Sequence, residues 1–162
     1  MVANYKKYKI KNRGVQVEII KIDDFEEIFM NRDISTLLGT AMFNPTFGKI
    51  QNIAQTVYAK TQGRFYICKI DGLLVGLIGF SKIDNHMLVV RHLAVLSTFQ
   101  RQKIGTELIR FAISDEKVKF VTAETDDEGV GFYKGFGFTV KKLPFDDATG
   151  QRYACTYEVL NP

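Results

Sequence analysis

The sequence predicts a mixed α/β protein in which helices pack on a central sheet. Two observations carry this prediction. Strand-like and helix-like segments follow one another in the order β-α-α-β-β-β-α-β-α-β-β, and Asp71-Gly72 between two apolar runs is a strong hairpin signal. No repeat or Pro/Ser-rich linker divides the chain, so we expect one domain over residues 1–162.

Seven strands are expected, and the sequence also suggests a short strand before the first of them. They cover residues 15–22, 64–70, 73–83, 87–95, 119–124, 138–143 and 152–160. These segments are rich in β-branched and aromatic residues and are bounded by turn residues. The N-R-G sequence at Asn12–Gly14 is a turn signal that pairs residues 15–22 with the short strand before it.

Four helices are expected, at residues 25–31, 47–60, 104–114 and 127–134. Asp23 and Asp24 are N-cap candidates for the first helix. The second and third helices each place apolar residues on one face, whereas Gly129 and Gly131 weaken the fourth. Residues 33–47 are less regular.

Composition narrows the class of protein. The 162 residues are 46% hydrophobic and 25% charged, as in soluble globular proteins. No apolar run reaches the roughly 20 residues that cross a bilayer, and the first ten residues lack the apolar segment of a signal peptide. We therefore expect a cytoplasmic protein with no membrane partner. Cys68 and Cys155 are far apart in apolar runs, so we expect two buried thiols and no metal site.

The net charge of +4 comes largely from basic residues near the N-terminus, namely Lys6, Lys7, Lys9, Lys11 and Arg13. Such a run could contact nucleic acid. It alternates with Tyr5, Tyr8 and Ile10, and a solvated edge strand explains this pattern equally well. We do not expect nucleic acid as a partner.

The most informative stretch runs from Leu93 to Thr106 and reads LAVLSTFQRQKIGT. An apolar run ends at Val95, and a polar loop reaches Gly105 as an amphipathic helix begins. Free backbone N–H groups at a helix N-terminus bind phosphate, and here Arg101 and Lys103 stand beside them. The stretch therefore predicts a site for an anionic, phosphate-bearing ligand.

A second segment, FYKGFGF, follows about 30 residues later and places Tyr133 on a short helix. Together the two segments resemble the signature motifs of the GNAT superfamily of N-acetyltransferases, which transfer an acetyl group from acetyl-CoA. The loop pattern of that family is Gln/Arg-x-x-Gly-x-Gly/Ala, and residues 100–105 read QRQKIG, with Lys103 in place of the middle glycine. The resemblance implies the GNAT fold, a mixed and mostly antiparallel sheet of about six to seven strands flanked by about four helices.

The resemblance also assigns acetyl-CoA as co-substrate and indicates its contacts. The expected cofactor-binding residues are Leu93, Ala94, Val95, Gln100, Arg101, Gln102, Lys103, Ile104, Gly105, Thr106, Asp126 and Phe132. The strand before the loop offers backbone groups to the pantetheine arm, and the N–H of Val95 is the expected oxyanion donor. Gly105 lets the backbone approach the ligand closely. Lys103 disturbs the loop only if it needs a positive φ, and Asp126 replaces a frequent Asn.

The chemistry needs a proton for the departing thiolate and a route for the proton of the amine. The resemblance assigns the first task to Tyr133, whose neutral O–H is a donor at pH 7. Related branches keep their bases at the positions of Val89 and Arg91. His92 follows Arg91 by one residue, so its side chain is expected on the other face of the strand. There it would be a packing or surface histidine. Glu124 is the best remaining carboxylate, although it could equally support the next helix start, and base catalysis through water is also open.

The acceptor is predicted only as a class. Residues 30–47, with Phe43, Asn44 and Phe47, are expected to shape its pocket, and the acidic cluster around Glu124 and Asp126 would attract a cationic amine. The expected acceptor is therefore a small-molecule amine or a protein amine, with a homodimer left open. The main prediction is an acetyl-CoA-dependent N-acetyltransferase. The alternatives are a non-catalytic CoA-binding sensor and an acyltransferase that uses another acyl-CoA.

Overall fold

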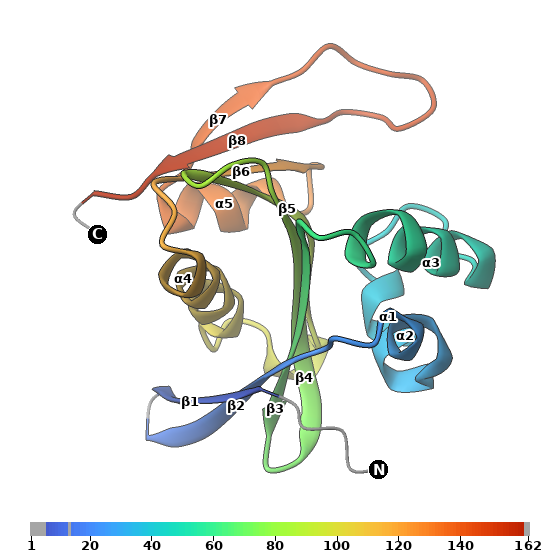
Figure 1. The fold of residues 1–162 in the computed structure, drawn as a ribbon. Helices are drawn as coiled ribbons and strands as arrows, with labels where there is room; N and C mark the ends of the chain where they lie inside the picture. The colour runs from blue at the N-terminus through green and yellow to red at the C-terminus, as the bar shows by residue number, and fades with distance from the viewer. Residues whose placement is uncertain (1–5, 13, 161–162) are drawn as a thin grey trace.

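A computed structural model describes residues 6–12 and 14–160, which form an eight-stranded sheet with five α-helices (Figure 1). The strands are β1 Lys7–Asn12, β2 Val15–Lys21, β3 Gly63–Ile70, β4 Leu73–Lys82, β5 Met87–Val95, β6 Phe120–Thr125, β7 Thr139–Lys142 and β8 Tyr153–Glu158. The helices are α1 Phe25–Met30, α2 Arg32–Gly39, α3 Phe47–Ile53, the π-helix η1 Ala54–Tyr58, the 3-10 helix η2 Ser97–Phe99, α4 Ile104–Glu116 and α5 Val130–Phe136.

The strand order is β1-β2-β3-β4-β5-β6-β8-β7, and β5–β6 is the parallel pair in an otherwise antiparallel sheet. The predicted mixed, mostly antiparallel sheet is thus confirmed, with eight strands where six to seven were expected. The added strand is β1, which pairs Asn12 with Val15 across the predicted turn. Arg13, in that turn, lies outside the described residues. Lys7 and Lys9 are exposed on β1, which is an edge strand as the basic pattern suggested.

The sheet separates two helical layers, each with its own apolar core (Figure 1). On one face α4 and α5 pack on a core that includes Leu108 and Tyr133. On the other face α1, α2 and α3 cover a core that includes Leu38 and Phe65. Every functional side chain can therefore be assigned to the α4 face or the α3 face.

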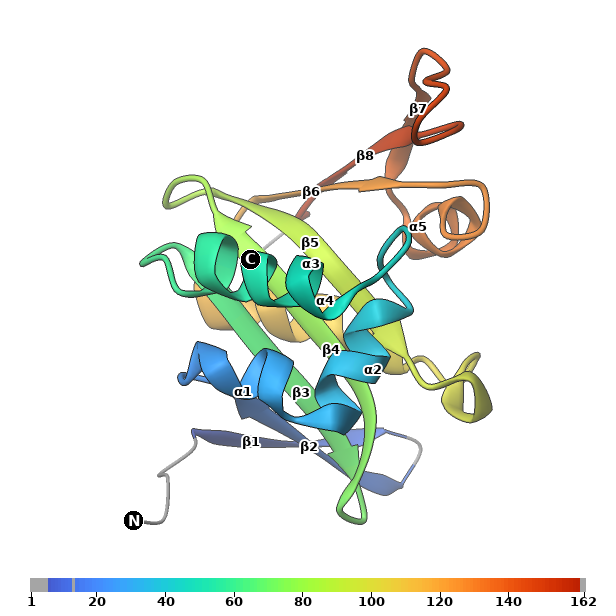
Figure 2. The ribbon, with the colours of Figure 1, turned by 90° about the vertical axis from the view of Figure 1, so that its right-hand side faces the viewer.

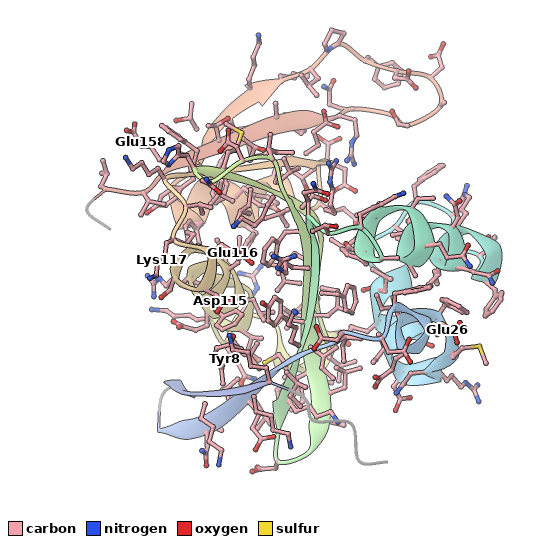
Figure 3. The ribbon with its side chains drawn as sticks, in the orientation of Figure 1. Tyr8, Glu26, Asp115, Glu116, Lys117 and Glu158 are labelled. Carbon is pink, nitrogen blue, oxygen red and sulfur yellow. The ribbon has the colours of Figure 1, made fainter. Side chains whose placement is uncertain are left out.

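The C-terminal end of α4 is anchored to the first strands. Tyr8 and Tyr66 donate hydrogen bonds of 3.0 and 2.7 Å to the two carboxylate oxygens of Asp115. Arg64 on β3 donates to Glu116 at 2.9 Å. Figure 3 shows Tyr8 just beneath Asp115 at this end of the helix. These contacts fix α4 at the end opposite to its N-terminal loop.

Three helix predictions need correction. Residues 32–39, expected to be irregular, form α2, because Asn31 caps it by accepting hydrogen bonds from the N–H groups of Asp33 and Ile34. The helix expected to end at Lys60 changes to π geometry at Ala54. The last helix begins at Val130 rather than at residue 127. The first helix is capped by Asp24, one of the two predicted candidates.

Cys68 and Cys155 are free and buried, as predicted. None of the helices within residues 6–12 and 14–160 has the length and hydropathy that a bilayer crossing requires.

Candidate functional site

Strand β5 consists of two halves with different neighbours. Met87–Val90 pairs with β6, whose register ends at Ala123, while β4 continues to pair with β5 as far as Val95. Beyond Val90 the two parallel strands separate, and within the described residues β6 provides no partner for the second half of β5. The separation leaves an open strand edge inside the sheet (Figure 2).

The open edge includes the N–H of Val95. The next residue, Leu96, donates its N–H to Val75 on the β4 side at 2.8 Å. Because backbone groups alternate sides along a strand, the N–H and C=O of Val95 point away from β4, toward the separation. The carbonyl of Val95 accepts a hydrogen bond of 3.1 Å from the Gln100 side chain. The N–H of Val95 is thus directed into the separation between β5 and β6.

The loop after β5 contains two residues in the left-handed region. Arg101 has φ 60° and Lys103 has φ 64°. Lys103 stands where the family pattern has its middle glycine. This left-handed conformation explains the glycine, because it costs an L-residue roughly 1–2 kcal/mol. Lys103 therefore keeps the backbone path of the family pattern and stores local strain in it.

The first turn of α4 is open to a ligand. Lys103 is the N-cap residue, and within the described part of the chain no side chain caps this helix. Free N–H groups and the positive end of the helix dipole therefore meet the exposed Lys103 and Arg101. A cavity of about 340 Å³ adjoins this turn and extends between α4 and β8. Its lining residues are Lys103, Thr106, Arg110, Ile113, Gly135, Phe136, Tyr157 and Val159.

The two signature segments meet at Gly105. A Cβ on Gly105 would lie 3.1 Å from the Phe132 ring and 3.7 Å from Val95. The missing side chain thus lets the start of α4 pack against α5, a reason for glycine that differs from the expected close approach to pyrophosphate. Ile104 is buried in the same core, whereas Gln102 is exposed and Thr106 partly exposed.

Tyr133 on α5 is buried on the α4 face, between the rings of Phe132 and Phe138. Burial raises the pKa of its hydroxyl above the usual 10, with a smaller contribution from Cys155. The group is therefore neutral at pH 7 and carries its proton. Among the described residues no side chain or backbone group accepts a hydrogen bond from it, so its proton is available to a ligand.

The two acidic candidates occupy different settings. Asp126 accepts hydrogen bonds from the N–H groups of Glu128 and Gly129, at 3.1 and 2.9 Å, so it organises the turn before α5. Glu124 is exposed on β6. Its neighbour Ala123 packs in the core of the α4 face, so Glu124 faces the α3 side. The Glu124 carboxylate and Tyr133 thus lie on opposite faces of the sheet.

The predicted direction of His92 was wrong. In the β4–β5 register Val90 pairs with Phe80 and His92 with Gly79, so Arg91 is an extra residue, a β-bulge. The bulge brings His92 to the α3 face, the same face as Val89. There its Nδ1 lies 2.5 Å from the Tyr58 hydroxyl. The expected packing role holds, although the face on which His92 packs is the other one.

The segment between α2 and α3 lies on the α3 side of the separated strands (Figure 2). Phe43 and Phe47 are exposed there, and Asn44 adopts φ 45°. The Lys49 ammonium fixes the segment by donating to the carbonyls of Phe43 and Asn44. The loop between β7 and β8, with exposed Phe145, extends to the same side (Figure 1). Aromatic side chains thus flank the face that carries Glu124.

Sequence reasoning missed three contacts at this site: the link from Gln100 to Val95, the packing of Gly105 on Phe132, and the Tyr58–His92 pair. Gly105 and Gly79 are sequence signals for the last two, since each marks a place where another side chain approaches the backbone, whereas the link from Gln100 to Val95 has no such signal.

The site therefore consists of an open edge between separating strands, next to an uncapped helix start with two cations. Residues 61–140 match the family model of the GNAT acetyltransferase domain. Residues 61–140 thus carry a GNAT acetyltransferase domain. No curated protein matches the chain.

Solved structures show the same fold. Ard1 from Thermoplasma volcanium is 23% identical, with 90% of this chain and 99% of that chain covered and a TM-score of 0.65. A GNAT family acetyltransferase from Elizabethkingia anophelis with acetyl-CoA bound is 17% identical, with coverages of 97% and 99% and a TM-score of 0.58. An aminoglycoside 6'-N-acetyltransferase complexed with coenzyme A is 13% identical, with coverages of 89% and 98% and a TM-score of 0.63.

Proposed function

We propose that this protein transfers the acetyl group of acetyl-CoA to a primary amine. The observation that carries the proposal is the convergence of three features: the open edge of β5, the uncapped start of α4 and the helix that bears Tyr133. Two structural neighbours hold coenzyme A or acetyl-CoA, which supports this choice of donor. The proposal treats residues 1–162 as one catalytic domain.

The donor would be held mainly by backbone groups. Leu93, Ala94 and Val95 would bind the pantetheine arm as an added strand edge. The N–H groups at the start of α4 would bind the pyrophosphate, with added attraction from Arg101 and Lys103. The neighbouring cavity, which contains Lys103 and Arg110, suits the remaining anionic part of the cofactor.

The remaining cofactor assignments rest on the loop and on α5. Gln100 would hold the carbonyl of Val95 so that its N–H stays available, and Gln102, Ile104 and Thr106 would shape the phosphate loop. Gly105 and Phe132 would join the loop to α5. Asp126 would contribute by organising the backbone before α5, because its carboxylate already accepts two N–H groups.

The reaction would proceed by direct attack of the amine on the thioester. The Val95 N–H would stabilise the oxyanion, and Tyr133 would donate its proton to the departing sulfur as the C–S bond breaks. Glu124, on the acceptor side, would attract the cationic amine and receive its proton. Phe43, Phe47 and Phe145 would contact the carbon part of the acceptor.

A thiol-release assay with acetyl-CoA and a panel of amines tests the proposal. The panel should include aminoglycosides, short peptides, and small aliphatic and aromatic amines. Release of coenzyme A that depends on one amine, with formation of its amide, is the expected result. Binding of acetyl-CoA without turnover across a broad panel would favour the sensor, and a stronger thermal shift with a longer acyl-CoA would favour another donor. The absence of any thermal shift with acetyl-CoA would refute the proposal.

A further inference from the structure

On the α3 face, a hydrogen bond between Tyr58 and His92 supports the second half of β5 and is not used by the acyl-transfer chemistry. The Tyr58 hydroxyl lies 2.5 Å from Nδ1 of His92, and the two rings meet edge to face with centroids 5.9 Å apart. Tyr58 is buried at the end of η1, the continuation of α3. The contact therefore joins the acceptor-side helix to the strand that carries Leu93, Ala94 and Val95.

Several local features are needed to make this contact. A Cβ at position 79 of β4 would overlap the Tyr58 hydroxyl and ring. Glycine is therefore required at this position for the tyrosine to reach β5. The π geometry of η1 adds a residue to the helical turn that ends at Tyr58. The bulge at Arg91 turns His92 to the α3 face. Irregular features of three elements thus meet at one hydrogen bond.

We assign the Tyr58 hydroxyl as the donor of that bond, because the hydroxyl is buried and, within the described residues, Nδ1 of His92 is its hydrogen-bond partner. Burial raises the pKa of the Tyr58 hydroxyl, while burial and then Arg91 lower the pKa of His92 to about 4. Both groups are neutral at pH 7. The buried Tyr58 hydroxyl donates to Nδ1, so the proton of the neutral imidazole is on Nε2. In this tautomer His92 has no free lone pair to accept the proton of an amine, which leaves it a positioning role.

We propose that Tyr58 and His92 are positioning residues that hold the open half of β5 in its acetyl-CoA-binding geometry. The inference rests on the proposed function, since it concerns binding at the same strand. The bulge is where β5 loses β6, so Leu93, Ala94 and Val95 are aligned by β4, by apolar packing on both faces of the sheet and by the Tyr58–His92 hydrogen bond. The contact also couples the α3 side, where the amine would bind, to the donor strand.

Tyr58→Phe removes the hydrogen bond and keeps the ring. We expect the Kd for acetyl-CoA to rise about 3- to 10-fold, the effect of one hydrogen bond, while kcat at saturating acetyl-CoA changes less than about twofold. Amide hydrogen exchange should increase in the peptide that contains Ala94 and Leu96, whose N–H groups point toward β4. Calorimetric titration, steady-state kinetics and exchange mass spectrometry give these three readouts.

Tyr66→Phe is the matched control. Tyr66 is also buried and donates a hydrogen bond of 2.7 Å, but its partner is Asp115 at the far end of α4. This variant should lose comparable stability and keep the wild-type Kd. A second pair separates geometry from packing: His92→Asn retains a hydrogen-bonding group near Nδ1 and should keep most of the affinity, whereas His92→Leu should lose it.

The wild-type titration comes first. If the wild-type protein does not bind acetyl-CoA, the proposed function fails, and the Tyr58–His92 contact has no ligand to position. If the wild type binds, and Tyr58→Phe matches Tyr66→Phe in Kd and in exchange of the peptide that contains Ala94 and Leu96, the positioning role is refuted while the proposed function stands. The positioning role is supported if Tyr58→Phe and His92→Leu lose affinity for acetyl-CoA while Tyr66→Phe and His92→Asn keep it.

Discussion

Helices α3 and α4 both follow a loop, but they begin in different ways. At α3 the Thr46 hydroxyl caps the helix by accepting the N–H of Lys49 at 3.2 Å. At α4 no side chain within the described residues caps the first turn, and the residues before it, Arg101 and Lys103, have positive φ. A capped start is complete without a ligand, whereas an uncapped start beside two cations is suited to an external anion. The difference indicates where this chain favours binding over local stability.

The start of α4 is proposed to bind the cofactor, whereas Tyr133 on α5 is proposed to take part in the chemistry. Tyr133→Phe has the largest expected effect, because it should change turnover without changing binding. The variant leaves the start of α4 intact and removes the hydroxyl on α5 that we propose as the proton donor. We expect turnover to fall about 100-fold or more, with acetyl-CoA affinity nearly unchanged. Tyr153→Phe, which removes a hydroxyl bound to Asp127 at 2.7 Å, is the control and should keep its turnover. Wild-type turnover in Tyr133→Phe would disprove the acid role.

A second prediction concerns the end of η1, the continuation of α3, where Tyr58 is hydrogen-bonded to His92. The pKa of His92 is lowered to about 4 from its ordinary 6.5. As pH falls below 6.5 the unfolded chain takes up a proton that the folded protein does not, so stability is lost progressively down to about pH 4. Between pH 7 and 4.5 this loss amounts to about 2 to 3 kcal/mol.

Urea unfolding at the two pH values measures the effect. The loss should be clearly smaller in His92→Asn and unchanged in His86→Asn, because His86 is exposed. Equal losses in both variants would show that His92 is not the group responsible.

Lys103→Asp should reverse the character of the α4 start. A carboxylate at the positive end of the helix dipole stabilises a helix by about 0.3–1 kcal/mol, and Asp tolerates the left-handed conformation. The same carboxylate repels phosphate, so we expect acetyl-CoA affinity to fall at least about tenfold while the melting temperature is kept or raised. Titration calorimetry and thermal unfolding measure the two effects. Unchanged affinity would mean that the phosphates bind elsewhere.

Thr46→Ala is the complementary experiment at α3. Loss of an N-cap residue costs about 1 kcal/mol of stability. Acetyl-CoA affinity should stay at the wild-type value, since the cap serves only the helix. The two variants thus predict opposite changes in stability and affinity. Weaker cofactor binding in Thr46→Ala would remove the distinction between the two helix starts.

The smallest effect is expected for Lys103→Gly, which restores the residue of the family pattern. Relief of the left-handed strain should stabilise the protein, and the greater freedom of glycine in the unfolded chain should offset part of this, leaving a net gain below about 1 kcal/mol. Affinity should fall only slightly, through loss of the ammonium. A marked destabilisation, measured by urea unfolding, would show that the φ of Lys103 is not strained.

Much of this architecture could be predicted because its signals are local. The strand over Met87–Val95 and the start of α4 at Ile104 match the sequence prediction, since apolar runs and turn residues mark both. The positive φ of Lys103 could not be predicted, because lysine does not encode it. The bulge at Arg91 was hidden for a similar reason: its cause lies in pairing with β4. A rule based on strand alternation therefore placed His92 on the wrong face.

The site was predictable to the same extent. Gly105 and Tyr133 stand in recognisable motifs, whereas the Tyr58–His92 pair joins residues 34 positions apart through a gap at Gly79. Only the folded chain brings such contacts together.

Titration of acetyl-CoA into the wild-type protein and into Lys103→Asp is the most direct test of the central claim that the start of α4 and the open half of β5 form a donor site. We expect one bound acetyl-CoA per chain in the wild type and affinity at least about tenfold weaker in the variant, with equal or higher thermal stability. No binding to the wild type, or equal binding by both proteins, would contradict it.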